Sequence, residues 1–120
     1  MLDSRIRAAV ESLYKGLCTV YVQKEVTDPI THVTSFAEEA AMENIPCRLS
    51  FSTIYSAQEG VADGLKQVTK LFIAPEVRIP AGSKIVVTQE NVTTAYVRSG
   101  EPAYYESHQE IVLDLFQRYA

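Results

Sequence analysis

The chain has 120 residues, of which 47% are hydrophobic, and its formal net charge at pH 7 is −4. This length fits one domain, residues 1–120, and at this size roughly two-thirds of the unfolded surface can be buried without a metal or a disulfide. The short apolar runs exclude a membrane-spanning helix, the first residues lack a signal-peptide core, and the scattered Lys and Arg residues argue against direct nucleic-acid binding, so we expect a cytoplasmic protein.

An amphipathic helix is predicted over residues 2–14, within an N-terminal segment 1–15. Four apolar residues recur at spacings of three and four and would share one face of this helix: Leu2, Ile6, Val10 and Leu13. Asp3 or Ser4 can cap its first turn, and Gly16 ends it.

After the helix, apolar and polar residues alternate with a period of two, which predicts strands. We expect six strands before residue 100: 18–26, 32–37, 45–51, 67–74, 84–89 and 92–98. The second has the weakest pattern. Pro46 places the third at a sheet edge or at its own first residues, because proline cannot donate a ladder hydrogen bond. The last two are expected to pair as a hairpin across Glu90-Asn91.

The tail, residues 109–120, fits two patterns. A period of two places Ile111, Leu113 and Leu115 on one face, as in a strand. A helical period also gathers apolar residues on one face: Ile111, Val112, Leu115, Phe116 and Tyr119. Periodicity does not choose between them, and we favour a strand that turns helical near its end.

A long connection covers residues 52–66, between the third and fourth strands. It contains Gly60 and Gly64 and few large apolar groups. Long irregular segments in compact domains are usually functional or disordered. Two interpretations stay open: a surface loop without a role, and an interface segment that partners order.

The residues with reactive side chains do not form a recognisable catalytic or metal-binding pattern. Cys18 and Cys47 each lie in an alternating segment and are expected to be buried thiols. Together with His32 and His108 they lack the paired spacing of a zinc site. We therefore expect no catalytic residues, no metal, no cofactor and no enzyme activity.

Two polar or aromatic clusters remain to be interpreted. The acidic residues Glu38, Glu39 and Glu43 are expected to form a solvated surface. Tyr104-Tyr105 could stack bases in an OB-like barrel. Because no basic residues are interleaved with them, we expect these tyrosines in a core or a protein interface instead.

Five short segments follow one another in an order that resembles a known family. They are Ile45-Pro46-Cys47-Arg48-Leu49-Ser50-Phe51, Lys70-Leu71-Phe72-Ile73-Ala74-Pro75, Ile79-Pro80-Ala81-Gly82-Ser83-Lys84-Ile85, Tyr96-Val97-Arg98-Ser99-Gly100-Glu101-Pro102 and His108-Gln109-Glu110-Ile111. Over residues 17–116 this succession is similar to the small head-closure, or stopper, proteins of the head-to-tail connector in long-tailed phages and prophages. The helix at residues 2–13 has no match.

The resemblance implies a mainly β protein: a small β-barrel over residues 17–120, with an N-terminal α-helix and the long inter-strand loop 52–66. Copies would form a homo-oligomeric ring between an adaptor or portal-side connector protein and a tail-terminator protein. That ring would close the DNA-filled head and offer the tail its attachment surface, in the host cytoplasm during assembly and then in the virion. DNA would pass through the ring without sequence-specific contacts.

Two sets of site residues are expected, the first implied by the resemblance and the second in the helix that the resemblance does not match. The channel loop would include Tyr55, Gln58, Glu59, Gly60, Asp63, Gly64 and Lys66. The helix residues Leu2, Ile6, Val10 and Leu13 would dock on the adaptor ring or cap the barrel. The alternatives are a tail-terminator or tail-completion protein and an OB-like nucleic-acid-binding module.

Overall fold

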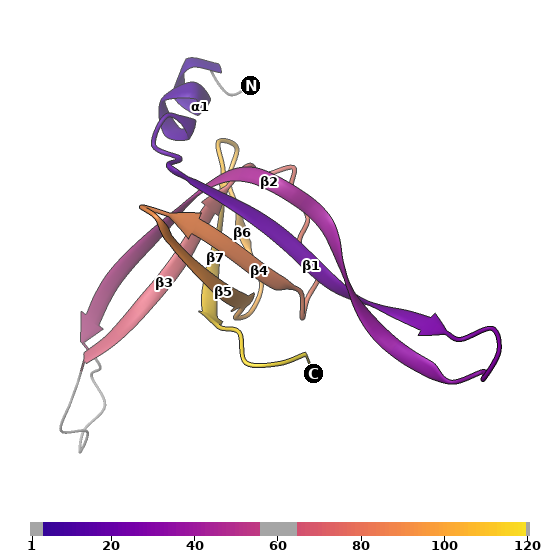
Figure 1. Cartoon of the computed structure of the whole chain (residues 1–120). Helices are drawn as coiled ribbons and strands as arrows, with labels where there is room; N and C mark the ends of the chain where they lie inside the picture. The colour runs from indigo at the N-terminus through magenta and orange to yellow at the C-terminus, as the bar shows by residue number, and fades with distance from the viewer. Residues whose placement is uncertain (1–3, 56–64, 120) are drawn as a thin grey trace.

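The computed structural model describes residues 4–55 and 65–119, which form one short helix and seven strands (Figure 1). In chain order these are α1 (Ser4–Glu11), β1 (Gly16–Thr27), β2 (Thr34–Tyr55), β3 (Leu65–Ile73), β4 (Lys84–Gln89), β5 (Val92–Arg98), β6 (Ala103–Tyr104) and β7 (Gln109–Leu115). The mainly β class with an N-terminal helix is therefore confirmed.

The strands pair antiparallel in the order β3-β2-β1-β4-β5-β7, and a further pairing of β3 with β7 closes this order into a ring. The short β6 adds to β7. We call β1, β2, β3, β4, β5 and β7 the strand ring. Its β4–β5 hairpin has the predicted bounds, and both turn residues, Glu90 and Asn91, have the positive φ angles that a tight two-residue hairpin turn requires.

The core lies inside the strand ring and follows from the alternation of each strand. Its members among the described residues are Cys18, Val20, Cys47, Leu49, Leu71, Ile73, Ile79, Ile85, Val87, Tyr96, Ile111 and Leu113. Fully burying one such Leu or Ile contributes about 1.5–3 kcal/mol relative to leaving it exposed. Cys18 and Cys47 are both buried and free, which confirms the prediction of buried thiols.

One strand stands where the sequence predicts two. The expected strands 32–37 and 45–51 are parts of β2, which runs without a break over 22 residues. Between them the chain has a short acidic stretch and mostly exposed residues, so no burial pattern predicts a strand there. The stretch is extended because it pairs with β1, and bulges near Val20 absorb the change of register.

The predicted loop 52–66 is also shorter than expected. Residues 52–55 belong to β2 and residues 65–66 to β3, with Tyr55 opposite Leu65 and Ile54 opposite Lys66. Thr, Ile and Tyr favour strands, and the β2–β3 ladder continues through them. Residues 56–64 lie outside the described part of the chain.

The first and the last predicted elements of the chain also differ from the structure. The helix ends at Glu11, so Leu13 lies in the turn that follows. At the other end, the strand alternative is confirmed for the tail, because β7 pairs with β3, β5 and β6. The expected helical turn is wrong: residues 116–119 form no helix. Pairing on both sides outweighs the helical pattern of this segment.

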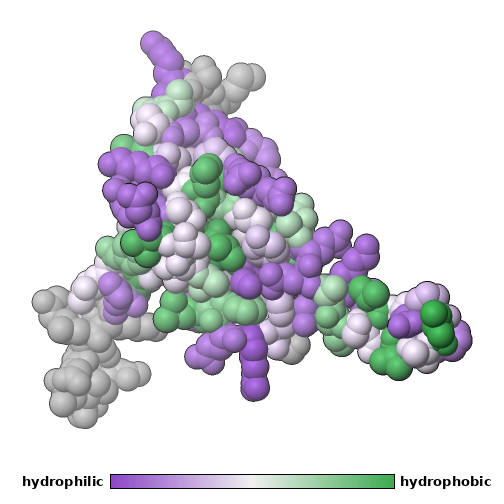
Figure 2. Space-filling model, viewed as in Figure 1, coloured by the Kyte–Doolittle hydropathy of each residue, from purple (hydrophilic) through white to green (hydrophobic). Residues whose placement is uncertain are grey.

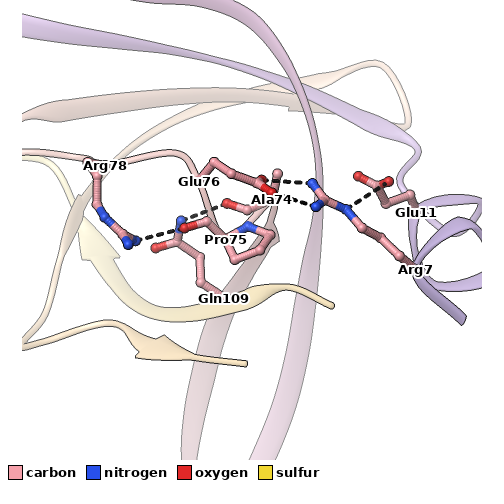
Figure 3. A network of polar contacts seen from close by, with 7 residues as sticks. All are labelled: Arg7, Glu11, Ala74, Pro75, Glu76, Arg78 and Gln109. Carbon is pink, nitrogen blue, oxygen red and sulfur yellow. Dashed lines mark hydrogen bonds and ion pairs between the residues drawn. The ribbon is translucent and has the colours of Figure 1, made fainter. Parts of the chain in front are cut away.

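A buried glutamine holds the connection between β3 and β4 in place. The Gln109 side chain is fully buried, and its Nε2 donates to the carbonyl oxygens of Ala74, at 2.8 Å, and Val77 (Figure 3). In the same connection Arg78 donates to the carbonyl of Pro75 at 2.7 Å. The amide nitrogen thus binds two carbonyls outside the strand pairing, of which that of Ala74 also accepts from the Val77 N–H, while the buried Oε1 of Gln109 has no partner.

Candidate interaction surfaces

A two-stranded ribbon extends beyond the strand ring. The pairing of β1 with β4 ends at Tyr21, and β2 meets β3 only from Cys47 onward. Between these points residues 22–27 of β1 and 34–39 of β2 pair only with each other, and we call residues 22–39 the arm. Figure 1 shows it projecting away from the ring. The radius of gyration is 17.4 Å, against about 14 Å for a compact domain of this length, and the arm is one reason for the difference.

The arm is exposed and still rich in apolar side chains. Residues 23–39 are all exposed, and four of them are large hydrophobics: Val26 (43%), Ile30 (85%), Val33 (60%) and Phe36 (66%). Figure 2 shows several hydrophobic residues along the projecting hairpin, interspersed with hydrophilic ones. An apolar projection of this kind is typical of a surface that a partner covers.

The tip of the arm is an ordered turn. The Asp28 carboxylate accepts hydrogen bonds from the backbone N–H groups of Ile30, at 2.8 Å, and Thr31, at 3.2 Å. These bonds hold the pKa of Asp28 below its ordinary value. An Asp that bonds the backbone two residues on is typical of a tight turn, so Ile30 is held outward by a defined structure.

The arm is also acidic. It contains Lys24 and four carboxylates, Glu25, Asp28, Glu38 and Glu39, a formal charge of −3 out of the −4 of the whole chain. Lys24 approaches Glu39 at 3.7 Å, but both side chains are exposed, so this pair contributes little to stability.

A clamp formed by the C-terminal segment fixes the base of the arm. The Glu38 carboxylate accepts hydrogen bonds from Lys84 Nζ, at 3.1 Å, and from the Tyr119 hydroxyl, at 2.9 Å. These two bonds lower the pKa of Glu38. Desolvation, and then the bond to Glu38, raise the pKa of Tyr119 to about 12. Lys84 Nζ also lies over the Phe116 ring, 5.5 Å from its centroid. The tail thus contacts the arm where it leaves the ring.

Helix α1 lies beyond the start of β1, outside the ring (Figure 1), and is anchored to the β3–β4 connection by an ion pair. Arg7 binds both carboxylate oxygens of Glu76, with Nη2 at 2.7 Å from Oε2, and its Nε lies 3.4 Å from Glu11 (Figure 3). Glu76 lies in the connection that Gln109 holds. The bidentate geometry fixes the helix against this connection.

A cleft of about 280 Å³ lies between α1 and the outer face of β2, β3 and β7. The residues that line it are Val10, Leu13, Tyr14, Arg48, Phe72, His108 and Glu110. We call it the α1 cleft. Most of its wall is apolar, and Leu13, which is 50% exposed, stands at its edge. A cavity of 150 Å³ holds benzene, so the α1 cleft has room for two aliphatic side chains.

Aromatic and basic groups continue from this cleft along the outer surface. Arg48 lies over the Phe72 ring at 5.9 Å, Phe72 contacts His108 at 5.5 Å, and Tyr105 stacks on His108 at 4.9 Å between ring centroids. Glu110 is bound by His108 at 2.9 Å and approaches Lys70 at 3.6 Å.

The two adjacent tyrosines are not in the core. Tyr104 is 48% and Tyr105 51% exposed, so the core alternative for them is wrong. Arg78 lies 4.1 Å from the centroid of the Tyr104 ring. Arg78 belongs to a distant segment of the chain, so no local sequence pattern predicts its contact with Tyr104.

Some of the helix residues predicted to dock on a partner line the α1 cleft, and others do not. Val10 is half-buried and lines the α1 cleft together with Leu13, whereas Ile6 is 53% exposed. Leu2 lies outside the described residues. The docking role of these residues stays a prediction.

The residues predicted for the channel loop are only partly described. Tyr55 and Lys66 are in β2 and β3, on the ribbon where residues 52–55 pair with residues 65–68. The other five lie outside the described residues: Gln58, Glu59, Gly60, Asp63 and Gly64.

Two known types of site do not occur within residues 4–55 and 65–119. No group of three His, Cys, Asp or Glu side chains there is close enough to hold a metal ion. The same part of the chain contains no helix with the length and hydrophobicity needed to cross a bilayer.

Comparison with known proteins gives one structural likeness. No protein-family model and no curated protein matches the chain. Among solved structures, it is similar to the phage-like element PBSX protein xkdH from Bacillus subtilis, with a TM-score of 0.49 and 18% sequence identity, over 82% of this chain and 91% of that one. A likeness at this level does not establish a shared function.

Proposed function

We propose that this chain is a structural subunit of the head-to-tail connector of a long-tailed phage or prophage, where copies form a ring that closes the DNA-filled head. The proposal starts from the resemblance of five segments to the head-closure proteins. Eight of the twelve core residues come from those segments: Cys47, Leu49, Leu71, Ile73, Ile79, Ile85, Tyr96 and Ile111. The resemblance therefore rests on the residues that build the strand ring.

The observation that carries the proposal is a rigid strand ring from which two ribbons project. The arm is one. The other is formed by residues 52–55 and 65–68, which continue the β2–β3 ladder beyond the last residue of β3 that pairs with β7, Thr69. This second ribbon leads to the segment that the resemblance assigns to the channel. A connector subunit needs a stable frame and projections that meet neighbours or line a bore, and the role needs no catalysis.

The charge of the chain supports the same role. Proteins that hold nucleic acid tightly neutralise its phosphates with Lys and Arg. This chain is acidic, with a net charge of −4. A conduit through which DNA must slide gains from a surface that does not bind phosphates.

The test is removal of the gene from its parent phage or prophage, followed by negative-stain electron microscopy of the lysate. We expect emptied or DNA-leaking heads beside separate, intact tails, and restoration of infectious particles by the wild-type gene. Normal infectious particles would overturn the proposal. Full heads with overlong or ragged tails would instead assign the protein to tail completion.

The stacked aromatic residues favour a second candidate function, single-strand binding in the manner of an OB-like module. Tyr105 and His108 present a stacked pair beside Arg48 and Phe72, and base stacking on such rings contributes about 1–3 kcal/mol per base. Filter binding of a labelled single strand at low salt tests it. Retention that falls with salt and with Tyr105→Ala would support this candidate, and no retention would remove it.

A further inference from the structure

The arm has an apolar tip that the rest of its own chain leaves uncovered. Two-stranded hairpins without a third strand are marginally stable in water. The arm nevertheless keeps Ile30 and Val33 exposed, at 85% and 60%, on a turn ordered by Asp28. Side chains held outward on an ordered turn are suited to insert into a cavity of a partner.

The α1 cleft has the size and lining to receive that tip. Val10, Leu13 and Phe72 form apolar walls, and its volume of about 280 Å³ is nearly twice that of a cavity that holds benzene. The side chains of Ile30 and Val33 carry seven carbon atoms between them, which this space accommodates. Leu13 is half exposed at the edge and would be covered when the tip is in place.

The charges of the two surfaces are complementary. The arm carries a formal charge of −3. At the cleft, Arg48 is exposed and lies over the Phe72 ring, and Lys15 lines a neighbouring hollow together with Leu13 and Arg48. The acidic lining residue, Glu110, is already bound by His108 and faces Lys70. Arg48 and Lys15 thus lie beside the apolar cleft, with Glu90 in the same neighbouring hollow, and Glu25 and Asp28 lie near the apolar tip.

We propose that the arm of one copy docks in the α1 cleft of a second copy. The arm and helix α1, which lines the cleft, lie at opposite ends of β1 (Figure 1), so a copy cannot fill its own cleft. Each copy would give one arm and receive another, and such a head-to-tail contact produces a ring when its rotation closes. This inference rests on the proposed function, because it takes the partner to be a second copy. It names the two surfaces through which neighbouring copies would contact one another in the oligomeric ring.

Cysteine cross-linking tests the contact on purified full-length protein. Ile30→Cys and Leu13→Cys proteins are mixed at high concentration and treated with a short bis-maleimide, while Cys18 and Cys47 are buried and shielded. We expect at least tenfold more covalent dimer in the mixture than in either protein alone. The matched control is Leu115→Cys, 66% exposed at the other end of β7, which should not cross-link to Ile30→Cys. A stronger cross-link to Leu115 than to Leu13 would overturn the assignment of the cleft.

A mixing experiment tests whether the contact joins two different surfaces. One variant has residues 24–37 replaced by Asn-Gly, which leaves the cleft without an arm; the other carries Leu13→Arg, which leaves the arm without a cleft. In analytical ultracentrifugation, each variant alone should stay monomeric, the mixture should form 1:1 dimers and nothing larger, and the wild type should form larger species. Dimers of the Leu13→Arg protein alone would show arm-to-arm pairing and overturn the proposal, as would a wild type that stays monomeric at every concentration reached.

These outcomes separate this inference from the proposed function. Cross-linked, cleft-dependent oligomers from a gene whose loss leaves particles normal would keep the inference and remove the connector role. Leaking heads without any arm-to-cleft cross-link would keep the connector role and remove the inference.

Discussion

The strand ring and the arm are made from the same two strands, yet they are stabilised in different ways. In the ring, β1 and β2 have further neighbours in β4 and β3, and alternate residues such as Val20 and Cys47 are completely buried. In the arm the same strands have only each other, and residues 23–39 are all exposed. Secondary structure therefore continues where burial stops. The buried core of the strand ring stabilises the fold. Because the arm continues two strands of that ring, its apolar residues stay ordered although they are exposed to water.

The sharpest test of this comparison removes the same atoms from both regions. Ile111→Ala, in the ring, should lower the free energy of unfolding by about 2–5 kcal/mol, because it loses buried methyl groups and leaves a cavity. Ile30→Ala, at the tip, should change it by less than about 0.5 kcal/mol. Urea unfolding followed by circular dichroism measures both. Equal losses would mean that the arm shares the core of the monomer, and the comparison would fail.

A polar pair of substitutions gives the next largest effect. Gln109→Met keeps the length of the side chain but removes the donor to the Ala74 and Val77 carbonyls. Loss of these two part-buried hydrogen bonds should cost about 1–3 kcal/mol, although the Ala74 carbonyl keeps its bond from the Val77 N–H and the buried, unpaired Oε1 of Gln109 is removed as well. Gln23→Met, on the exposed arm, is the matched control and should be close to neutral. Thermal and urea unfolding of the two variants would contradict this prediction if Gln109→Met were as stable as the wild type.

Shortening the arm should have a small effect on the monomer. Replacing residues 24–37 by Asn-Gly joins Gln23 to Glu38, which already face each other, through a turn that favours hairpins. The residues removed bury little, and their ordering costs conformational entropy, so stability should change by about 1 kcal/mol or less. Urea unfolding at low protein concentration provides the measurement. A loss of several kcal/mol would show that the arm is needed for the ring to fold.

The smallest effect concerns pH and the clamp at the base of the arm. The pKa of Glu38 is lowered in the folded chain by its bonds to Lys84 and Tyr119. A lowered pKa gives stability that is present above the ordinary value of 4.5 and is lost as pH falls through the folded pKa. Glu38→Gln should therefore cost less than about 1 kcal/mol at pH 7, and this cost should shrink as the pH falls below 4.5. Glu39→Gln is the control. A cost that did not shrink on acidification would assign the clamp to something other than the Glu38 charge.

The sequence predicts those parts of the fold whose residues have a buried face. The β4–β5 hairpin is correct to the residue, because Ile85, Val87 and Tyr96 alternate inward and Glu90-Asn91 suits its turn. For residues 109–120 periodicity fits both a strand and a helix, and the strand β7 is decided by its pairing with β3 and β5, which turns Ile111 and Leu113 inward. Hydrophobic periodicity arises from the burial of one face, so it predicts a strand correctly where one face of that strand packs against the core.

Where no face of a segment is buried, the sequence pattern does not predict its structure. Residues 38–44 are part of β2 only because β1 lies beside them, and the predicted strands 18–26 and 32–37 did not indicate that they form an arm that projects from the strand ring. The α1 cleft brings Leu13, Arg48 and Phe72 together through strand pairing and the anchoring of a helix. Such a site depends on contacts between distant segments, which single-sequence patterns do not contain.

The position of β7 has a consequence for how the chain is made. It closes the ring by pairing with β3 on one side and β5 and β6 on the other, and it is the last ring strand to leave the ribosome. Until then β3 and β5 present open edges, which are templates for pairing with other chains. Closure also joins segments about 40 residues apart, a pattern typical of slow folding. The nascent chain therefore has two unpaired strand edges that can aggregate with other chains, and they stay unpaired until β7 has been synthesised.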